Sequence, residues 1–418
     1  MSIADERTPL VQNHMGCGQL AVMLALTGSL YSYGGVFISL AVIAAHKAGL
    51  TSIGLDKSDI SKGQTLFWVG WGIGSALIMP CLDRFGRKLP CLGLLVLGLV
   101  FVLLSTQAPT PFCYAVCVFF VGCAANIAVA SNLLMQESIP ERFRYLGMVV
   151  QNVLWSISTA LVAVVGSSLT RQVSWHTETL LWEIPFALAL LLGLVFLSDS
   201  PEFWKARAEA ASEGSSQLTV LGAWQRLFCD PDLRSCICAT VVCWTAANVG
   251  AYGIDYTCGT LSSSLYANMA FVGVVNLIGY SLAGPIMNSL GPRKAQLIAF
   301  AGAVASMFVC AFLPAGSWRV ALALVAHFFL DVVFTTIYVL AVDCFPAECR
   351  GTALGVANCV ARISGLITPL FALMEVSTVS LIICALCAAG GLATWTLPGS
   401  TPTGPASEFL ESDSERKV

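Results

Sequence analysis

Charge is what this sequence has least of. Only 11% of its 418 residues are charged, whereas 57% are hydrophobic. The mean hydropathy is +0.80. Soluble domains carry about a quarter charged residues. This scarcity excludes an ordinary soluble protein, so the chain is better divided into membrane spans than into soluble domains.

Several other features are missing, and each absence removes a class of protein. The apolar runs show no alternation with a period of two, which excludes a membrane β-barrel. The start, MSIADERTPLVQNHMG, has no basic segment before a short apolar core, so we expect the first span, not a cleaved peptide, to act as the signal. The glycine-rich GWGIG, 70–74, lacks the lysine of a phosphate loop. No metal cluster, nucleotide site or catalytic nucleophile stands out, so we expect no enzyme, no cofactor and no nucleic-acid partner.

Long apolar runs are what the sequence contains instead. A helix needs about 20 apolar residues to cross the hydrocarbon core of a bilayer. Twelve runs satisfy this, at about 17–45, 64–82, 90–108, 112–136, 146–168, 179–197, 235–256, 264–287, 296–314, 318–342, 351–374 and 377–396. The sequence therefore predicts an all-α membrane protein with twelve transmembrane helices.

The basic residues indicate how these helices are oriented. With the amino terminus inside, the loops on its side carry 12 of the 21 basic residues and the opposite loops carry 5. By the positive-inside rule both termini are cytoplasmic. Three more basic residues lie in the tails, and the last, Arg362, is the only one within a span. Most of the 17 cysteines lie in spans or on the cytoplasmic side, where they behave as small apolar residues.

The chain divides into two related halves. Its longest polar stretch between spans, 198–234, separates six spans from six, and the spacing of Val220, Trp224, Leu227 and Phe228 fits a short amphipathic helix on the membrane surface; a plain linker is the alternative. The predicted domains are two tails, two bundles and this linker, at 1–16, 17–197, 198–234, 235–396 and 397–418.

Two loop motifs occur once in each half. MPCLDRFGRK, 79–88, aligns with GPIMNSLGPRK, 284–294, at an offset of 205 residues, and ESIPERFRYLGM, 137–148, aligns with DCFPAECRGTALG, 343–355, at an offset of 206. Two independent motifs at nearly the same offset indicate a duplicated six-helix unit. Two such halves rocking about a central site is the design of secondary transporters.

These motifs also carry a family resemblance. The DRFGRK loop resembles the signature of the major facilitator superfamily, and SDSPEFW, 198–204, resembles a motif of its sugar porters and organic ion transporters. LFCDPDLR, WTAANVGAYGID, NSLGPRKAQ and GVANCVARISGLITPL resemble the organic anion and organic cation/carnitine transporter family. The paired-glutamine signature of sugar porters is absent from span 7. Met79, Ser198 and Asp199 depart from the pattern, and only about 46–63 remains of the large extracellular loop after span 1, so the chain resembles a compact, divergent member.

Arg362 is the residue that most needs an explanation, because a charge at bilayer depth costs roughly 3 kcal/mol or more. Arg350 is at the cytoplasmic end of this helix, and Arg362 lies 12 residues after it. In span 10, Asp343 is at the cytoplasmic end, and Asp331 lies 12 residues before it. Arg362 and Asp331 are therefore both about 18 Å deep, at one level. His327 lies four residues before Asp331, so the two share a helix face.

Two interpretations of these charges stay open. In one, the Arg362 guanidinium binds a substrate carboxylate, while Asp331 and His327 hold it in position or couple protons to transport. In the other, Arg362 and Asp331 form a structural ion pair. The resemblance adds that arginine at this position is similar to the anion and carnitine branches, whereas many members of the cation branch have aspartate there.

Aromatic and amide side chains in other spans are candidates for the same cavity. Trp244, Asn248 and Tyr252 repeat at four-residue spacing in span 7, and Tyr252 lies where the resemblance places a substrate-facing tyrosine. Gln151 and Trp155 share a face of span 5, and Tyr338 shares one with Asp331. Helix packing or an interfacial aromatic belt is the alternative role for each of them.

The charged loop residues are expected at the cytoplasmic face. In the resembled superfamily such groups form charge pairs between helices that hold one state closed. This predicts gating roles, with anchoring of basic residues to lipid headgroups as the alternative, for Asp83, Arg84, Arg87, Lys88, Glu137, Arg144, Asp343 and Arg350.

The sequence therefore predicts a twelve-helix transporter of small organic anions or zwitterions that works by alternating access, with a proton or counter-ion as a further partner. The alternatives are an organic cation carrier anchored by Asp331 and a transporter-like protein that moves no solute. The intact motifs in both halves argue against the last. The plasma membrane is the expected location, with endosomes or lysosomes as the alternative because DERTPLV, 5–11, resembles an acidic dileucine signal.

Overall fold

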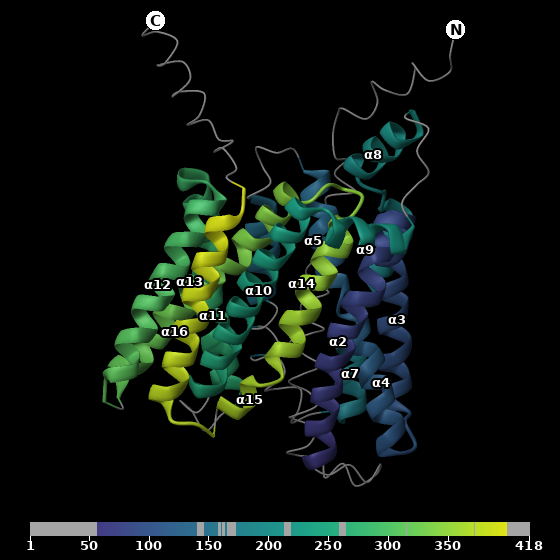
Figure 1. The fold of residues 1–418 in the computed structure, drawn as a ribbon. Helices are drawn as coiled ribbons and strands as arrows, with labels where there is room; N and C mark the ends of the chain where they lie inside the picture. Colours follow the sequence, from purple (N-terminus) through teal and green to yellow (C-terminus); the bar gives the residue numbers. More distant parts are fainter. Residues whose placement is uncertain are drawn as a thin grey trace, which may run out of the picture.

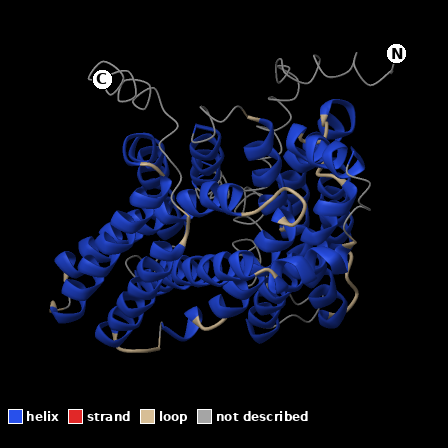
Figure 2. Cartoon of the chain, turned by 45° about the horizontal axis from the view of Figure 1, so that its top comes forward, coloured by secondary structure: helices blue, strands red, loops and turns tan. Residues whose placement is uncertain are grey.

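The computed structural model describes residues 57–139, 146–157, 160, 164, 173–212, 219–258, 265–314, 316–371 and 373–398, and these contain helices and connections but no strand (Figure 2). The helices run side by side (Figure 1). Their bounds are α2 (Lys57–Phe85), α3 (Lys88–Thr106), α4 (Pro111–Ala124), α5 (Ile127–Ser138), α7 (Trp175–Phe196), α8 (Pro201–Ser212), α9 (Val220–Cys229), α10 (Pro231–Cys258), α11 (Leu265–Leu290), α12 (Pro292–Phe312), α13 (Ser317–Cys344), α14 (Arg350–Gly365), α15 (Thr368–Phe371) and α16 (Val376–Thr396).

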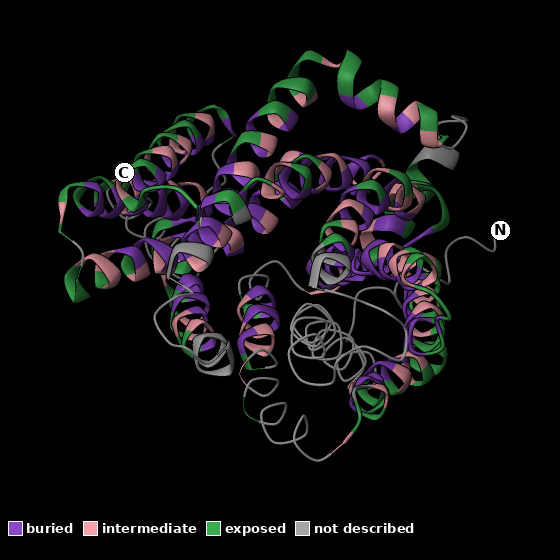
Figure 3. Ribbon diagram, turned by 90° about the horizontal axis from the view of Figure 1, so that it is seen from below, coloured by how far each residue is buried: buried purple, intermediate pink, exposed green. Residues whose placement is uncertain are grey.

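These helices follow the predicted spans closely. Within the described residues, nine helical segments are long and apolar enough to cross a membrane, and the helix Leu146–Ile157 is a shorter apolar one. The predicted first span, 17–45, lies outside the described residues. Many exposed side chains are apolar, among them Leu77, Leu191 and Leu392 with exposures of 68%, 61% and 75%. Figure 3 shows exposed residues along the outer sides of the helices. Such a surface suits lipid.

Two predicted spans are each built from two helices. The span 112–136 is divided into α4 and α5 by a turn at Ala125 and Asn126, and the span 351–374 is divided into α14 and α15 by a turn at Leu366 and Ile367. At the first turn the Asn126 amide donates to the carbonyl oxygens of Trp71 and Cys123, both at 3.0 Å. The side chain therefore provides partners for backbone groups next to the break.

The two copies of the first loop motif, 79–88 and 284–294, share a glycine with a positive φ. Gly86 after α2 and Gly291 after α11 both have a positive φ, 87° and 78°. This conformation favours glycine because a side chain at Cβ is strained there. The equivalence supports the internal duplication inferred from the sequence.

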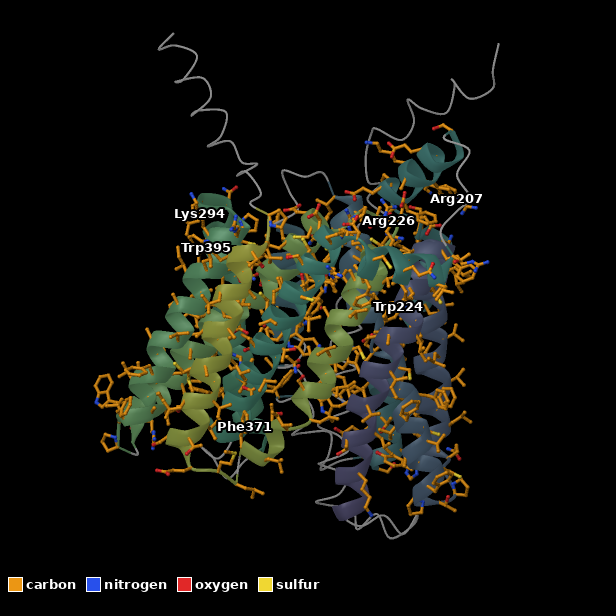
Figure 4. The ribbon with its side chains drawn as sticks, viewed as in Figure 1. Arg207, Trp224, Arg226, Lys294, Phe371 and Trp395 are labelled. Carbon is orange, nitrogen blue, oxygen red and sulfur yellow. The ribbon has the colours of Figure 1, made fainter. Side chains whose placement is uncertain are left out.

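The predicted linker 198–234 contains α8 and α9, which lie at one end of the molecule (Figure 1). Arg207, Arg226 and Lys294, three of the basic residues predicted to be cytoplasmic, lie at this end, whereas Phe371 lies at the opposite end (Figure 4). Helix α9 is the predicted amphipathic helix, and it buries Ala223 and Leu227 while Leu221 stays exposed. We call the end that carries α8 and α9 the cytoplasmic end.

Candidate functional site

Arg362 lies in the last turn of α14 and is 6% exposed. Its Nη1 donates hydrogen bonds to Asn248 Oδ1 at 3.0 Å and to the Tyr252 hydroxyl at 3.3 Å, and its Nε donates to Asn358 Oδ1 at 3.2 Å. All three partners are neutral. Among the described residues no carboxylate forms an ion pair with Arg362, so its positive charge is not compensated there.

Aromatic rings surround the Arg362 guanidinium. Its central carbon lies 3.8 Å from the ring centroid of Trp71, 5.3 Å from that of Trp68 and 5.9 Å from that of Tyr252. The Trp68 and Trp71 rings are parallel, with centroids 5.5 Å apart, and Trp68 meets Tyr252 edge to face at 5.2 Å. Such contacts stabilise a cation without neutralising it.

A chain of buried hydrogen bonds connects Arg362 to the other half of the molecule. Asn358, which accepts from Arg362, donates to the Ser75 hydroxyl at 2.7 Å. Ser75 in turn lies within hydrogen-bond distance of Asn126 Oδ1 and of the Trp71 carbonyl. The predicted residues Asn248 and Tyr252 thus reach Arg362, whereas Trp68, Trp71, Asn358 and Ser75 were missed by sequence reasoning.

Asp331 and Arg362 form no ion pair in the structure, so the contact that both open interpretations allowed between them is not found. The His327 imidazole lies between two carboxylates, with Nδ1 3.4 Å from Asp331 and Nε2 3.1 Å from Asp255. Asp331 faces α11, where a Cβ on Gly279 would come within 2.7 Å of its side chain. Arg362 and Asp331 therefore have separate partners, because their helices turn these side chains toward different neighbours. His327 does share a face with Asp331, as predicted, and Asp255 is an additional member.

Of the remaining predicted cavity residues, two come together and the other two have separate neighbours. Trp244 is fully buried and meets Tyr338 edge to face at 5.0 Å, so two predicted residues come together. Gln151 is fully buried as well; its amide donates to Ser131 at 3.3 Å, and its Oε1 has no hydrogen-bond partner within the part of the chain that the structure describes. Trp155 is partly buried against the apolar core.

A second group of charges joins the two halves at the cytoplasmic end. Glu137 of α5 accepts two hydrogen bonds from Arg87, both at 2.8 Å, and one from Arg350 of α14 at 2.9 Å. Ser200 also donates to Glu137, and Arg350 donates to Glu202 of α8 at 2.5 Å. One carboxylate thus binds an arginine from each half.

The burial of Arg87 does not neutralise it. Burial alone would lower its pKa, but the carboxylates of Glu137, Asp83 and Asp199 together outweigh this, and the pKa of Arg87 is raised above its ordinary value. Arg87 also donates to the Ala347 carbonyl at 2.9 Å, which adds another contact with the second half.

Asp83 caps a helix that belongs to the other half. Its carboxylate accepts hydrogen bonds from the backbone amides of Gly351 and Thr352, at 2.8 and 2.7 Å, and from the Thr352 hydroxyl at 2.8 Å. These amides lie in the first turn of α14, where backbone N–H groups have no acceptor within the helix and the dipole favours a negative charge. Asp199 caps α3 similarly, accepting from the amides of Arg87 and Lys88 at 2.6 and 2.8 Å.

Three predicted gating residues have other positions, and a fourth is not described. The Arg84 side chain is exposed and lies over the Phe85 ring at 5.4 Å, Lys88 contributes its backbone amide, and Asp343 is exposed. Arg144 lies outside the described residues. The structure thus brings Asp83, Arg87, Glu137 and Arg350 together, and we call these four residues the cytoplasmic gate.

Comparisons with known proteins point to one superfamily. A family model described as Major Facilitator Superfamily matches residues 15–369. "Solute carrier family 22 member 15-like" from Xenopus laevis is 24% identical over 393 residues, which cover 84% of this chain and 78% of that protein. The "Organic cation transporter protein" of Drosophila melanogaster is 24% identical over 387 residues, covering 84% of this chain and 70% of that protein.

A solved structure shows the same fold. The major facilitator proton:xylose symporter XylE, bound to 6-bromo-6-deoxy-D-glucose, superposes with a TM-score of 0.70 at 18% identity, covering 92% of this chain and 96% of that chain. The family and the fold are those of transmembrane transporters and not of enzymes. Because the family model spans well over half of its length, this chain belongs to the Major Facilitator Superfamily.

Proposed function

We propose that this chain carries small organic anions, or zwitterions with an anionic group, across its membrane by alternating access, with Arg362 as the substrate anchor. The observation that carries the proposal is the environment of the Arg362 guanidinium, which is buried and has only neutral partners among the described residues. A buried charge without a counter-charge is costly. A substrate carboxylate would supply that counter-charge.

The geometry suits a carboxylate on an apolar, planar molecule. The Nη2 atom of Arg362 has no hydrogen-bond partner among the described residues, so the guanidinium can offer a donor to a carboxylate. The rings of Trp68 and Tyr252 lie beside it and provide an aromatic wall. The Drosophila relative is named an organic cation transporter, which supports an organic ion as the substrate. We propose the negative sign of the substrate's charge from the positive charge of Arg362.

The cluster of Asp255, His327 and Asp331 favours a second candidate function. Two carboxylates with one imidazole between them attract a cation, and Asp255 is partly exposed, with 28% of its side chain accessible. We propose a coupled proton as the occupant, which retains Arg362 as the substrate anchor. An organic cation at the same carboxylates is the alternative.

Uptake into sealed vesicles that contain the purified protein tests these assignments. A panel of labelled organic anions and cations is offered to the wild type and to Arg362→Ala, Arg362→Lys and Asp331→Ala. We expect the wild type to move anions and Arg362→Ala to lose roughly 10- to 100-fold in apparent affinity, as for a lost hydrogen bond to a charged group. Arg362→Lys should recover part of this loss, because it keeps the charge but not the planar fork.

The matched control is Lys294→Ala, which removes an exposed basic residue far from the site and should leave uptake unchanged. Transport of cations that Asp331→Ala abolishes and Arg362→Ala spares would contradict the anion assignment and support the alternative. Anion uptake that is equal in the wild type and Arg362→Ala would also contradict it.

The protein is a multi-pass membrane protein, and we propose the plasma membrane as its location. The N-terminal DERTPLV segment, which lies outside the described residues, supports endosomes or lysosomes as the alternative. Fluorescence microscopy of the tagged chain against markers of these membranes distinguishes the two.

A further inference from the structure

The Arg362 anchor is itself part of the contact between the two halves. Its guanidinium belongs to α14 and stacks on Trp71 of α2, at 3.8 Å from the ring centroid. Both side chains are buried, with exposures of 6% and 3%. The other cation–π distances among the described residues are 5.2 Å or longer, so this is the tightest such contact in that part of the chain.

From this stack, α2 and α14 remain in contact toward the cytoplasmic end, which is at the top in Figure 1, as far as the cytoplasmic gate. One turn on, Asn358 donates to Ser75 at 2.7 Å. At the next turn Gly355 packs so closely that an added Cβ would meet the Ser75 carbonyl oxygen and come within 2.7 Å of the Met79 Cβ. The last step is the bond from Gly351 to Asp83. We call these four contacts the α2–α14 seam, which is 12 residues long on α2 and about 18 Å in length.

We propose that Trp71 is the coupling residue of this transporter: its stack on Arg362 holds α2 against α14 and thereby keeps the cytoplasmic gate closed while the anchor is empty. The stack joins Arg362, the proposed substrate anchor, to α2, whose cytoplasmic end carries the gate residue Asp83. Every contact along the seam connects one half to the other, so a change at Arg362 has a packed route to Asp83. Trp71 touches the anchor and not the gate, so it acts through Arg362.

A bound anion would release this stack, a step that rests on the proposed function of Arg362. A cation–π contact depends on the positive charge of the guanidinium. A carboxylate paired with Arg362 neutralises that charge and draws the guanidinium toward itself, which weakens its attraction to the Trp71 ring. The loaded carrier then separates α2 from α14 more readily than the empty one, and this difference favours transport with substrate bound.

Hydrogen–deuterium exchange of the first turn of α14 measures the closed gate directly. The Gly351 and Thr352 amides have no acceptor within their own helix, so their protection reports the bond to Asp83. Mass spectrometry of the peptide spanning residues 346–356 follows these amides in the purified ligand-free protein. We expect Trp71→Leu and Arg362→Met each to raise their exchange rate roughly tenfold, as for loss of a desolvated cation–π contact.

The double variant decides whether Trp71 acts through Arg362. If it does, Trp71→Leu combined with Arg362→Met exchanges no faster than either single variant, and Trp71→Tyr, which keeps an aromatic ring, stays close to the wild type. If Trp71→Leu does not fold, Trp71→Met replaces it in the double variant, because methionine fills much of the space that the tryptophan side chain leaves. Trp182→Leu on α7 is the matched control and should leave the peptide protected.

Three results would overturn the proposal: unchanged exchange in both Trp71→Leu and Trp71→Met, single effects that multiply in the double variant, or equal deprotection by Trp182→Leu. Benzoate, an aromatic carboxylate, separates this proposal from the proposed function. It should raise exchange in the wild type and not in Arg362→Met. If the double variant exchanges no faster than either single variant but benzoate has no effect on the wild type, the coupling through Trp71 is supported and the anion assignment of Arg362 is contradicted.

Discussion

At the scale of single residues, Glu137 is the side chain on which the cytoplasmic gate depends most. Its carboxylate binds Arg87 from one half and Arg350 from the other, and its side chain is fully buried. Glu137→Gln would leave two buried arginines facing a neutral amide. Because breaking a buried ion pair typically costs about 3–5 kcal/mol, we expect a clearly lower midpoint of thermal unfolding in detergent.

The control for Glu137 is Glu209→Gln on α8, where the carboxylate lies 4.0 Å from Lys205 and both side chains are mostly exposed. Surface pairs of this kind contribute little to stability, so its unfolding midpoint should stay at the wild-type value. Equal shifts in the two variants would contradict a special role for Glu137.

The sequence singles out Arg362 as the only basic residue within a span, but it does not give the partners of this side chain. Residue spacing gives the depth of a side chain within one helix, which is why Arg362 and Asp331 were placed at one level. Spacing does not tell which helix each face meets. Asp331 turns toward α11, while Arg362 meets Trp71 on a helix almost 300 positions away in sequence, and local periodicity contains no signal for that contact.

At the scale of helices, the α2–α14 seam depends on the absence of side chains. An added Cβ on Gly355 would meet the Ser75 carbonyl, which is backbone and cannot turn aside. Gly355→Ala should therefore push α14 away from α2, and overpacking of this kind typically costs about 1–3 kcal/mol. We expect a lower unfolding midpoint together with faster exchange of the Gly351 and Thr352 amides.

The matched control for Gly355 is Gly93 in the middle of α3, where an added Cβ would meet nothing within 4 Å. Gly93→Ala should leave amide exchange at α14 unchanged and increase stability slightly, because alanine is the better helix former. If Gly355→Ala behaved like Gly93→Ala, the seam would not be as tightly packed as its geometry indicates.

Helix positions could be predicted better than helix ends and breaks. Long apolar runs identify spans because the bilayer requires them, and the described helices follow those runs. The turns at Ala125 and Leu366 fall within runs that hydropathy treats as single spans. Asn126 at the first turn, and Gly365 and Pro369 beside the second, are residue types common at helix ends, but they do not lower the hydropathy enough to divide either run. The cap of α14 by Asp83 could not be read from the chain either, because its donor and acceptor lie 268 positions apart.

At the scale of the whole molecule, the two halves share a fold but not their charges. Gly86 and Gly291 keep the same turn, yet Asp83 aligns with the neutral Asn288, and the four gate residues depend on carboxylates of the N-terminal half. The second half instead carries the Arg362 anchor and the cluster of Asp255, His327 and Asp331. The gate thus takes its carboxylates from the first half and its arginines from both, and we propose that the charges within the second half serve substrate binding and proton coupling.

This division leads to a prediction about the driving force. With the cytoplasmic end closed, the partly exposed Asp255 connects to His327, and His327 connects to Asp331, which also hydrogen-bonds Tyr280 of α11. Acid outside favours proton binding to this cluster while it faces outward, and a more alkaline interior favours release after the carrier has turned. In sealed vesicles, an acid-outside gradient should therefore raise substrate uptake several-fold over uptake without a gradient.

His327→Gln should remove the response to the gradient. Glutamine can hydrogen-bond the two carboxylates, but it cannot bind and release a proton at physiological pH. Exchange of substrate for substrate requires no net proton movement, so it should persist in this variant and show that the protein still folds and binds. His176→Gln on α7 makes the same change in the other half and should keep the gradient response. A wild type whose uptake does not respond to the gradient would show that the carrier is not coupled to protons. A His327→Gln variant whose uptake still responds would place the coupling at another group.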